Sequence, residues 1–263
     1  MEHVIRVEHA RVMLGGVEIL HDLTWSVEKG ARCFILGANG AGKTTLVKLL
    51  MGYVWPVFGA KVQVLGHTFG AVNLRELRRS IAWVSPFVHQ WLGGERQWTG
   101  LEMALSGLDG TIGFFRTASD GEKRRAREIL ESLKAGHLSD RPVAAMSSGE
   151  QVKVLIARAL MTRPELMILD EPSVYLDIAG RELLLRTIAD MARLRPEVTM
   201  VFITQRIEDI LPEFDCGMIL KSGRIVASGG RGSVLTERNL RNAFDLDIRL
   251  IRTQAGRLWT VIE

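Results

Sequence analysis

The sequence predicts an α/β protein with a mostly parallel sheet, an antiparallel β-region at its N-terminal end and a helical insertion. Three observations lead to this prediction: short apolar strands alternate with helices, a glycine-rich loop joins one such strand to a helix, and residues 87–145 carry helical patterns without a strong strand signal. Strands that alternate with helices form a largely parallel sheet with helices on both faces. At about 150 residues per domain, 263 residues predict one large or two small domains.

The first third of the chain begins with alternating apolar and polar residues, which is typical of half-buried strands, and continues with short apolar runs. Turns are expected at its paired or isolated glycines. The predicted elements are, in order, strands at 4–12 and 19–27 around a turn at Gly15 and Gly16, a buried strand at 31–36, a helix at 44–51, a strand at 61–65, a basic helix at 74–79 and a strand at 81–84.

The remainder of the chain is first helical and then returns to alternating strands and helices. The predicted elements are helices at 101–107, 121–135, 146–161 and 179–194, strands at 166–169 and 200–204, a hairpin at 218–227, a helix at 233–243 and a hairpin that turns at Ala255 and Gly256. This pattern divides the chain into a discontinuous α/β core (1–86 and 146–228), a helical subdomain (87–145) and a C-terminal extension (229–263).

Composition excludes several classes of protein. With 47% hydrophobic and 24% charged residues, the chain is an ordinary globular protein. Its net charge of +4 is weak for a dedicated nucleic-acid binder. The longest uncharged run, 80–94, has 15 residues, whereas a membrane span needs about 20, and the first residues lack the pattern of a signal peptide. Cys33 and Cys216 form no metal or redox spacing, which is typical of a reducing cytosol.

A phosphate-binding loop is predicted at residues 37–44, whose sequence fits G-x-x-x-x-G-K-[ST] between a strand and a helix. Glycines let backbone N–H groups turn toward phosphate oxygens, and the helix points its positive end at them. Lys43 would reach the β- and γ-phosphates of ATP, and the hydroxyl of Thr44 would bind Mg²⁺. The expected nucleotide-binding residues are Gly37, Ala38, Asn39, Gly40, Ala41, Gly42, Lys43, Thr44 and Thr45. A phosphate-loop NTPase core follows from this loop and its flanking elements.

Two acidic residues end the apolar strand 166–169. Asp170 is placed to hold Mg²⁺ beside a phosphate loop, and Glu171 is placed to polarise a water molecule. The alternative is an incidental acidic turn at the end of a strand.

A polar segment at 146–151 precedes a helix. Ser147 or Ser148 caps the helix, and Gly149 would let a phosphate approach closely. Considered alone, the segment is better explained as a plain helix cap.

Together these segments resemble the ABC-type ATPase family over about residues 1–230. Residues 37–44 are similar to its Walker A loop, 146–151 with 154–160 to its signature motif, 166–171 to its Walker B strand, and 173–177 to its D-loop, which ends in Asp177. The resemblance implies a head-to-tail dimer, here a homodimer, in which ATP lies between the phosphate loop of one copy and the signature of the other. The signature residues expected to contact ATP in this way are Ser147, Ser148, Gly149 and Glu150.

The sequence departs from the family at three positions. Leu14 stands where an aromatic residue stacks on adenine, so apolar contact remains but π-stacking is lost. Gln205 stands where the family has a switch histidine. Because glutamine does not become a cation near neutral pH, ATP hydrolysis with Gln205 in this catalytic role is expected to be slower. The alternative is that Gln205 is an equivalent hydrogen-bonding group and the rate changes little. Pro86 stands nearest to the position where the family has a glutamine after this strand. Gln90 or Gln97 would take the role of that glutamine from a longer loop.

The segment 83–98 is rich in aromatic residues, among them Trp83, Trp91 and Trp98. In the family, this region leads to the docking site of a membrane subunit. The alternative is that these side chains are buried in the hydrophobic core. The basic clusters at 75–79 and 123–127 are expected to be solvated helix faces, so no nucleic acid is expected as a partner.

The resemblance therefore implies an ATPase subunit, with ATP and Mg²⁺ as cofactors, that powers a separate integral membrane permease from the cytoplasmic face of the membrane. Two alternatives remain: a soluble ABC ATPase acting on nucleic acid or an assembly complex, and a regulatory ATP-binding module with little turnover. Substrate and direction of transport lie outside the reach of this chain, because it does not contact the cargo.

Overall fold

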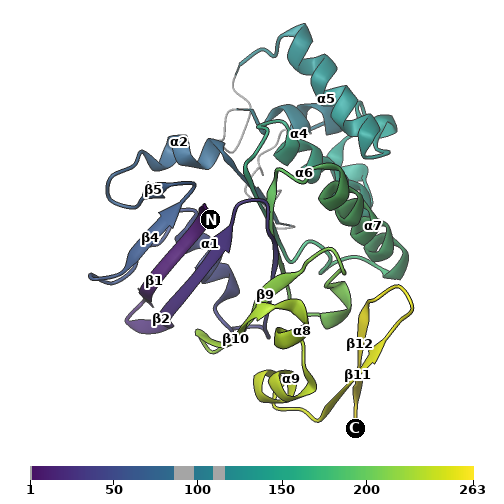
Figure 1. The fold of residues 1–263 in the computed structure, drawn as a ribbon. Coiled ribbons are helices and arrows are strands. Elements are labelled where there is room, and N and C mark those ends of the chain that lie inside the picture. The colour runs from purple at the N-terminus through teal and green to yellow at the C-terminus, as the bar shows by residue number, and fades with distance from the viewer. Residues whose placement is uncertain (1, 86–97, 109–115) are drawn as a thin grey trace. The chain divides into compact units, whose positions relative to one another are not determined.

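The computed structural model describes residues 2–85, 98–108 and 116–263 (Figure 1). The chain forms two compact units, one made of Met1–Leu77 with Ala192–Glu263 and the other of Arg78–Met191. We describe each unit by itself.

The first unit opens with an antiparallel sheet in the order β2-β1-β4-β5. Apolar side chains alternate along β1 and β2 and are buried on one face, which gives the strands their register. The expected turn at Gly15 and Gly16 is present, and both glycines have positive φ. The bounds of these elements are β1 His3–Leu14, β2 Val17–Glu28, β4 Lys61–Val64 and β5 His67–Thr68.

The second sheet of this unit has strands in the order β10-β9-β3-β8, with β3 parallel to both of its neighbours. Every residue of β8 is buried, as expected for a parallel strand that is covered on both faces. Helix α1 follows β3 after the predicted loop, and α1 contacts β2. The bounds are β3 Arg32–Leu36, α1 Lys43–Leu50, α2 Leu74–Arg79, β8 Thr199–Thr204, η3 Ile207–Asp209, β9 Cys216–Lys221 and β10 Arg224–Gly230.

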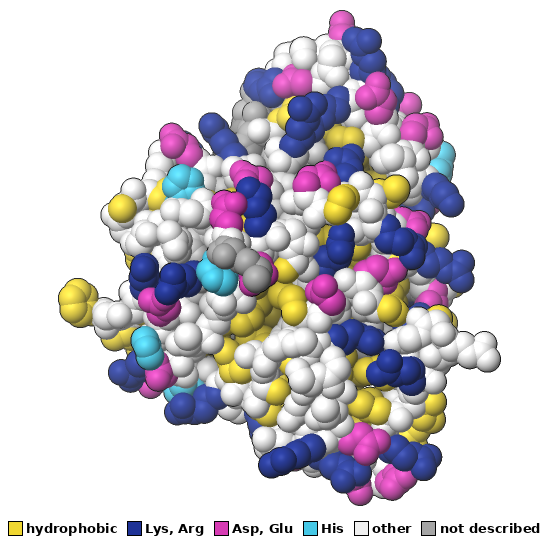
Figure 2. All heavy atoms as spheres, in the orientation of Figure 1, with side chains coloured by type: hydrophobic (Ala, Val, Ile, Leu, Met, Phe, Trp, Pro, Cys, Tyr) yellow, Lys and Arg dark blue, Asp and Glu magenta, His cyan; other side chains and the backbone are white. Residues whose placement is uncertain are grey.

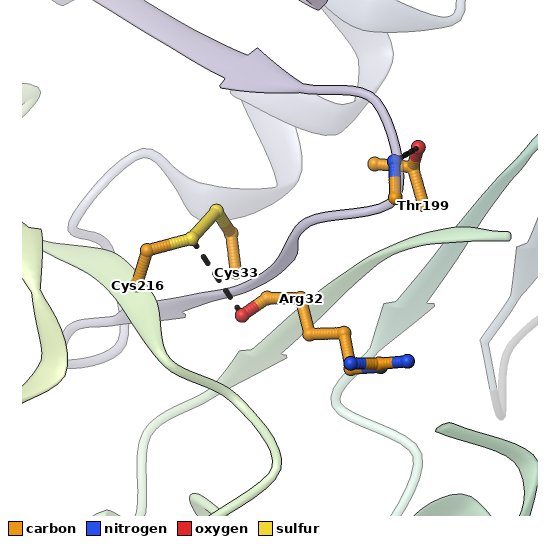
Figure 3. Close-up of a disulfide and its surroundings, with 5 residues drawn as sticks. Arg32, Cys33, Thr199 and Cys216 are labelled. Atoms are coloured by element: carbon orange, nitrogen blue, oxygen red, sulfur yellow. Dashed lines mark hydrogen bonds between the residues drawn. A yellow bond between two sulfur atoms is a disulfide. The ribbon is translucent and has the colours of Figure 1, made fainter. Parts of the chain in front are cut away.

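The two cysteines are joined by a disulfide, which corrects the expectation that they are typical of a reducing cytosol (Figure 3). Cys33 on β3 and Cys216 on β9 are register neighbours, with Cα atoms 4.7 Å apart, although 183 residues separate them in sequence. The sheet topology, which spacing in sequence does not report, brings them together. Both line an open groove of about 790 Å³ near the start of β1.

The C-terminal extension is α8, α9 and a hairpin of β11 and β12. The hairpin turn at Gly256 is confirmed, but the single helix expected at 233–243 is wrong. The helix is interrupted because Thr236 caps α9 by accepting from the amide of Asn239, whose own side chain donates to the carbonyls of Ser233 and Val234. The bounds are α8 Arg231–Val234, α9 Glu237–Phe244, β11 Ile248–Arg252 and β12 Leu258–Ile262.

The second unit contains the parallel pair β6 and β7 and a set of helices. Helices α4, α5 and α6 contact one another, and α6 also contacts β6. Each of these three helices begins with a capping box, headed by Thr99, Ser119 and Ser147 respectively, which explains where they start. The bounds are β6 Ile81–Val84, α4 Gly100–Leu105, α5 Asp120–Ser132, η1 Gly136–Leu138, η2 Val143–Ala145, α6 Ser148–Leu160, β7 Leu166–Asp170 and α7 Ile178–Leu194.

Among the described residues, no helix has the length and apolar character required to cross a membrane.

Candidate functional site

The glycine-rich loop lies in the first unit, between the end of β3 and the start of α1. Among the described residues, no side chain caps the N-terminus of α1, so its first N–H groups and the positive end of its dipole are directed at the loop. The side chain of Thr44 is exposed there, and Thr45 is half-buried. A helix start of this kind favours an anion.

Lys43 is folded over the loop. Its side chain is buried, and Nζ donates to the carbonyl oxygens of Gly37 at 2.8 Å and Ala38 at 2.9 Å. The ammonium charge is therefore held at the centre of the loop, where a phosphate group would be neutralised.

The backbone of the loop fits a bound polyphosphate. Gly40 and Gly42 have φ of +77° and +101°, which side chains rarely adopt. A Cβ on Gly37 would lie 2.5 Å from the carbonyl oxygen of Leu220, whereas a Cβ on Gly40 would meet no atom of the described part of the chain within 4 Å. The loop is thus packed tightly on the protein side and open beside Gly40, while Asn39 is exposed.

The turn between β9 and β10 is hydrogen-bonded to the backbone of the glycine-rich loop and of β2. The amide of Gly223 donates to the carbonyl of Ala41 at 2.9 Å, and the carbonyl of Gly223 accepts from the amide of His21 at 3.0 Å. Sequence reasoning identified this turn but not its role, because its only sequence signal was the Ser222-Gly223 pair.

Gln205 lies next to the start of the loop. Leu36 and Thr204 are register partners on β3 and β8, so Gly37 and Gln205 leave neighbouring strands at the same level. The amide of Gly37 donates to the carbonyl of Thr204 at 3.3 Å. Gln205 is half-buried, and the structure therefore brings it to the phosphate loop within this unit.

Leu14 ends β1 at an exposed apolar tip. It is 40% exposed and pairs with Val17, which is 61% exposed, next to Met13. Apolar surface is available at this tip, and the role of Leu14 against adenine stays a prediction.

Asp170 and Glu171 belong to the second unit, at the carboxyl end of β7. All of β7 is buried, including Asp170, while Glu171 is half-buried. Glu171 has φ of +49°, in the left-handed region that a non-glycine residue seldom adopts, and its carbonyl accepts from the amide of Val174. The chain turns sharply at this residue, so consecutive carboxylates are placed differently, and such strain is common at functional sites.

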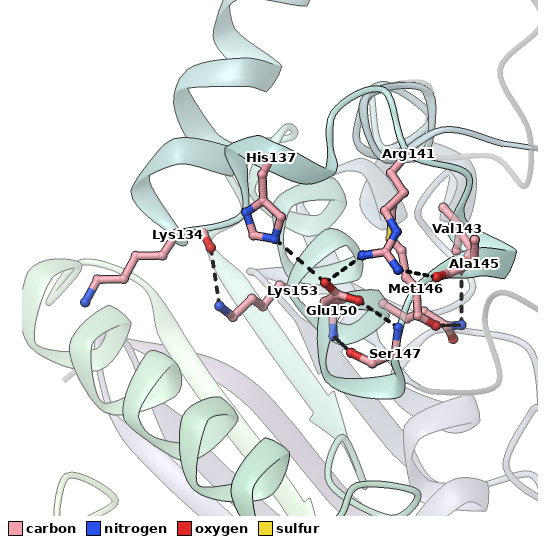
Figure 4. Close-up of polar contacts among 10 residues, drawn as sticks. Lys134, His137, Arg141, Val143, Ala145, Met146, Ser147, Glu150 and Lys153 are labelled. Carbon is pink, nitrogen blue, oxygen red and sulfur yellow. Dashed lines mark hydrogen bonds and ion pairs between the residues drawn. The ribbon is translucent and has the colours of Figure 1, made fainter.

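The segment 146–151 forms the N-terminus of α6 in the second unit (Figure 4). Ser147, and not Ser148, is the cap: its Oγ accepts from the amide of Glu150 at 3.3 Å, and Glu150 Oε2 accepts from the amide of Ser147 at 2.8 Å. Ser148 is exposed, and Gly149 is half-buried. The S-x-x-E spacing of this capping box is visible in the sequence.

The carboxylate of Glu150 is held in place by further contacts at the surface. Arg141 Nη1 donates to Glu150 Oε1 at 3.0 Å, and His137 Nε2 lies 3.7 Å from the same oxygen. The amide of Ser147 is the main cause of a lowered pKa of Glu150, with Arg141 adding to it. This carboxylate therefore stabilises the helix start, and its expected contact with ATP stays a prediction.

The same helix carries a buried lysine. Lys153 Nζ donates to the carbonyl of Lys134 at 3.4 Å, and burial lowers the pKa of Lys153. This residue tightens the contact between α6 and the end of α5.

Asp177 lies beside the start of α6. Its Oδ1 accepts from the amide of Gly180 at 2.7 Å and so caps α7. A Cβ on Gly149 would lie 3.7 Å from the Cα of Gly180, so the first turn of α6 and the first turn of α7 lie close together within this unit. Tyr175 and Ile178, on either side of Asp177, are 57% and 83% exposed.

Most of the predicted docking segment, including Pro86, Gln90, Trp91 and Gln97, lies outside the described residues. At its two described ends, Trp83 is half-buried on β6, and Trp98 is half-buried with its carbonyl accepting from the amide of Val143.

The basic cluster on α5 is mixed with acidic partners. Lys123 lies 3.8 Å from Asp120, and Arg116 forms two hydrogen bonds with Glu122, which lower the pKa of Glu122 to about 2. Over the face shown in Figure 2, basic and acidic side chains are interspersed. This pattern is typical of a solvated surface.

Comparison with known proteins gives a consistent result. A family model described as "ABC transporter" matches residues 20–174. A Bacillus subtilis (strain 168) protein, the uncharacterized ABC transporter ATP-binding protein YlmA, is 39% identical over 252 residues, which cover 95% of this chain and 94% of that protein. The cobalt import ATP-binding protein CbiO of Rhodobacter capsulatus is 32% identical over 92% of this chain and 85% of its own length.

Solved structures are similar in fold. One, an inward-facing conformation of a putative metal-chelate type ABC transporter, has a TM-score of 0.81 at 24% identity and covers 100% of this chain and 97% of its own. Another, the ADP conformation of an ATP-binding cassette of an ABC transporter, has a TM-score of 0.75 at 24% identity, with 93% and 96% covered. The expected α/β fold with a parallel sheet and a separate antiparallel sheet is thereby confirmed.

Proposed function

The chain belongs to the family of ABC transporter ATP-binding proteins, and on that premise we propose that it binds and hydrolyses ATP to drive transport by a separate membrane subunit. The observation that carries the proposal is the loop at 37–45. Its uncapped helix start, its left-handed glycines and the inward ammonium of Lys43 form a cradle for the phosphates of ATP.

The chemistry proposed for this site is metal-assisted hydrolysis. The hydroxyl of Thr44 and the carboxylate of Asp170 are of the oxygen type that Mg²⁺ prefers, and Mg²⁺ would supply charge neutralisation at the phosphates. Glu171 accepts a proton from the attacking water, and Gln205, adjacent to Gly37, orients the γ-phosphate by hydrogen bonding. Because a glutamine cannot carry the positive charge of a protonated histidine, turnover is expected to be slow.

A second copy of the chain is the proposed partner in ATP binding. The sequence holds one phosphate loop and one signature, and the exposed apolar side chains of Tyr175 and Ile178 border Asp177. In this dimer Ser147, Ser148, Gly149 and Glu150 would face the nucleotide, and Glu150 would also keep their helix start in place.

The membrane partner is proposed to dock around 83–98, in the helical subdomain assigned to 87–145, and would hold the chain at the cytoplasmic face of the membrane. The proposal divides the chain into a core of two segments (1–86 and 146–228), this subdomain and the extension 229–263. Names of relatives specify different cargo, including cobalt, zinc and phosphonates, which fits a subunit that binds nucleotide.

Affinity purification of the tagged full chain from detergent-solubilised membranes tests the proposal. The expected result is recovery of a multi-span membrane protein in a fixed ratio to the chain, together with ATPase activity that Glu171→Gln abolishes. Recovery with RNA in a salt-dependent manner, or with a soluble assembly and no membrane protein, would overturn it in favour of a soluble ABC ATPase.

A further inference from the structure

The segment that carries Gln205 leaves β8 and is anchored in part by the buried side chains of Ile207 and Ile210. After Gln205 and the exposed Arg206, the chain forms the three-residue 3₁₀ helix η3. The hydroxyl of Thr204 accepts from the amide of Arg206 at 2.9 Å and lies 3.4 Å from Oδ2 of the buried Asp209. A single 3₁₀ turn is marginal in isolation, so its position depends on tertiary contacts.

The C-terminal hairpin provides such contacts at Glu208. Thr260 Oγ1, on β12, donates to Glu208 Oε1 at 2.6 Å, and Arg257 Nη2 donates to the carbonyl oxygen of Glu208 at 2.8 Å. Both bonds end on one residue of η3, three positions from Gln205. Since each involves a charged group, they are stronger than neutral hydrogen bonds.

The hairpin is itself anchored on its other strand. The amide of Leu250 on β11 donates to Glu237 Oε1 at 2.9 Å, and Arg241 Nε donates to the carbonyl of Ile248 at 3.3 Å. Both partners are on α9, which contacts β9 and β10. The hairpin therefore connects η3 to the sheet of the first unit through a second attachment.

The orientation of Arg257 is fixed by its contact with the aromatic ring of Trp259. Its guanidinium lies over the ring of Trp259, 5.7 Å from the ring centroid, and the neighbouring Leu258 is buried. Stacking on an aromatic ring limits the rotamers of an arginine, so its donors are already directed. The turn of the hairpin is tied as well, because Arg231 Nη2 donates to the carbonyl of Gly256 at 2.9 Å.

We infer that the C-terminal hairpin, through Thr260 and Arg257, positions η3 and with it Gln205 beside the phosphate loop. Thr260 and Arg257 are positioning residues for ATP hydrolysis and do not contact the nucleotide. This inference rests on the function proposed above, and it assigns the C-terminal extension a role in turnover.

The variant Thr260→Val tests the inference, because it removes the hydroxyl and keeps the shape. Thr260→Ser restores the donor, and Glu208→Gln keeps an acceptor oxygen without the charge. Thr187→Val is the matched control, since its hydroxyl also donates to an oxygen, the carbonyl of Leu183, on the surface of α7. Two readouts are needed: hydrogen exchange of the amides of 205–210 in the nucleotide-free chain, and kcat and KM for ATP.

Thr260→Val is expected to speed exchange at 205–210 and to lower kcat by at least about tenfold, as the loss of one hydrogen bond to a charged group implies, with KM for ATP within about twofold of the parent. Thr260→Ser should match the parent and Glu208→Gln should fall between. An active parent with Thr260→Val indistinguishable from Thr187→Val in both readouts would overturn the inference alone. A parent chain that neither binds nor hydrolyses ATP would overturn the proposed function, and the inference with it.

Discussion

The turn at Gly223 should control how well the phosphate loop is formed, and Gly223→Ala should damage it. The residue has φ of +71°, and an added Cβ would lie 2.0 Å from the carbonyl oxygen of Ile19 and 2.8 Å from Cδ2 of His21. The first of these atoms is backbone on β2 and cannot rotate away. The turn must therefore shift, which lengthens the bonds from Gly223 to Ala41 and from His21 to Gly223.

Gly66→Ala is the matched control. Gly66 has φ of +76°, and an added Cβ would meet no described residue within 4 Å, so only left-handed strain of about 1 kcal/mol is expected. The reduced entropy of the unfolded chain is common to both variants and cancels. Gly223→Ala adds the loss of two backbone hydrogen bonds at about 1 kcal/mol each, giving a total of about 3 kcal/mol.

Urea unfolding of both variants measures these free energies, and titration with a fluorescent ATP analogue measures affinity. Gly223→Ala should bind ATP at least roughly tenfold more weakly than Gly66→Ala, since displacement of Ala41 by a fraction of an ångström misdirects the N–H groups that face phosphate. Equal stability and equal affinity in the two variants would refute the reasoning.

Three further predictions concern other sites. The free energy of unfolding should fall as the pH drops from about 4.5, the ordinary pKa of a glutamate, through the lowered pKa of Glu150, because the unfolded chain then binds one more proton than the folded chain. Glu150→Gln should reduce the difference in the free energy of unfolding between about pH 7 and pH 3, measured by urea titration. An unchanged difference between the two pH values would contradict the capping role. Gln205→His should raise the rate of phosphate release, and an equal rate would show that glutamine is an adequate substitute. Non-reducing peptide mapping by mass spectrometry should find Cys33 and Cys216 in one cross-linked pair that Cys33→Ser abolishes, and two free thiols would contradict the disulfide.

What the sequence predicted well was local. The loop at 37–44 is recognisable because glycine, lysine and threonine types are needed at fixed spacing between one strand and one helix. The helix start near Ser147 can also be predicted from the sequence, because Ser147 and Glu150 have the spacing of a capping box. Only the structure identifies Ser147, and not Ser148, as the capping residue.

What the sequence did not predict depends on strand order. Cys33 and Cys216 become neighbours because β9 pairs with β3, and no local pattern reports that pairing. The supports of the loop and of η3 are likewise remote: Gly223 and Thr260 reach their partners through turns whose sequences specify a bend but not its destination. The break between α8 and α9 was missed because the side chain of Asn239 competes for backbone carbonyls.

The measurement that tests the central claim most directly is ATP binding and hydrolysis by the purified full chain with Mg²⁺, compared with Lys43→Ala and Glu171→Gln. The parent is predicted to bind ATP and release phosphate. Lys43→Ala should lose binding, while Glu171→Gln should still bind but hydrolyse at least about 100-fold more slowly. A parent that binds no ATP, or a Lys43→Ala variant that binds it as tightly as the parent, would contradict the claim that this loop is the nucleotide site of an ABC transporter ATPase.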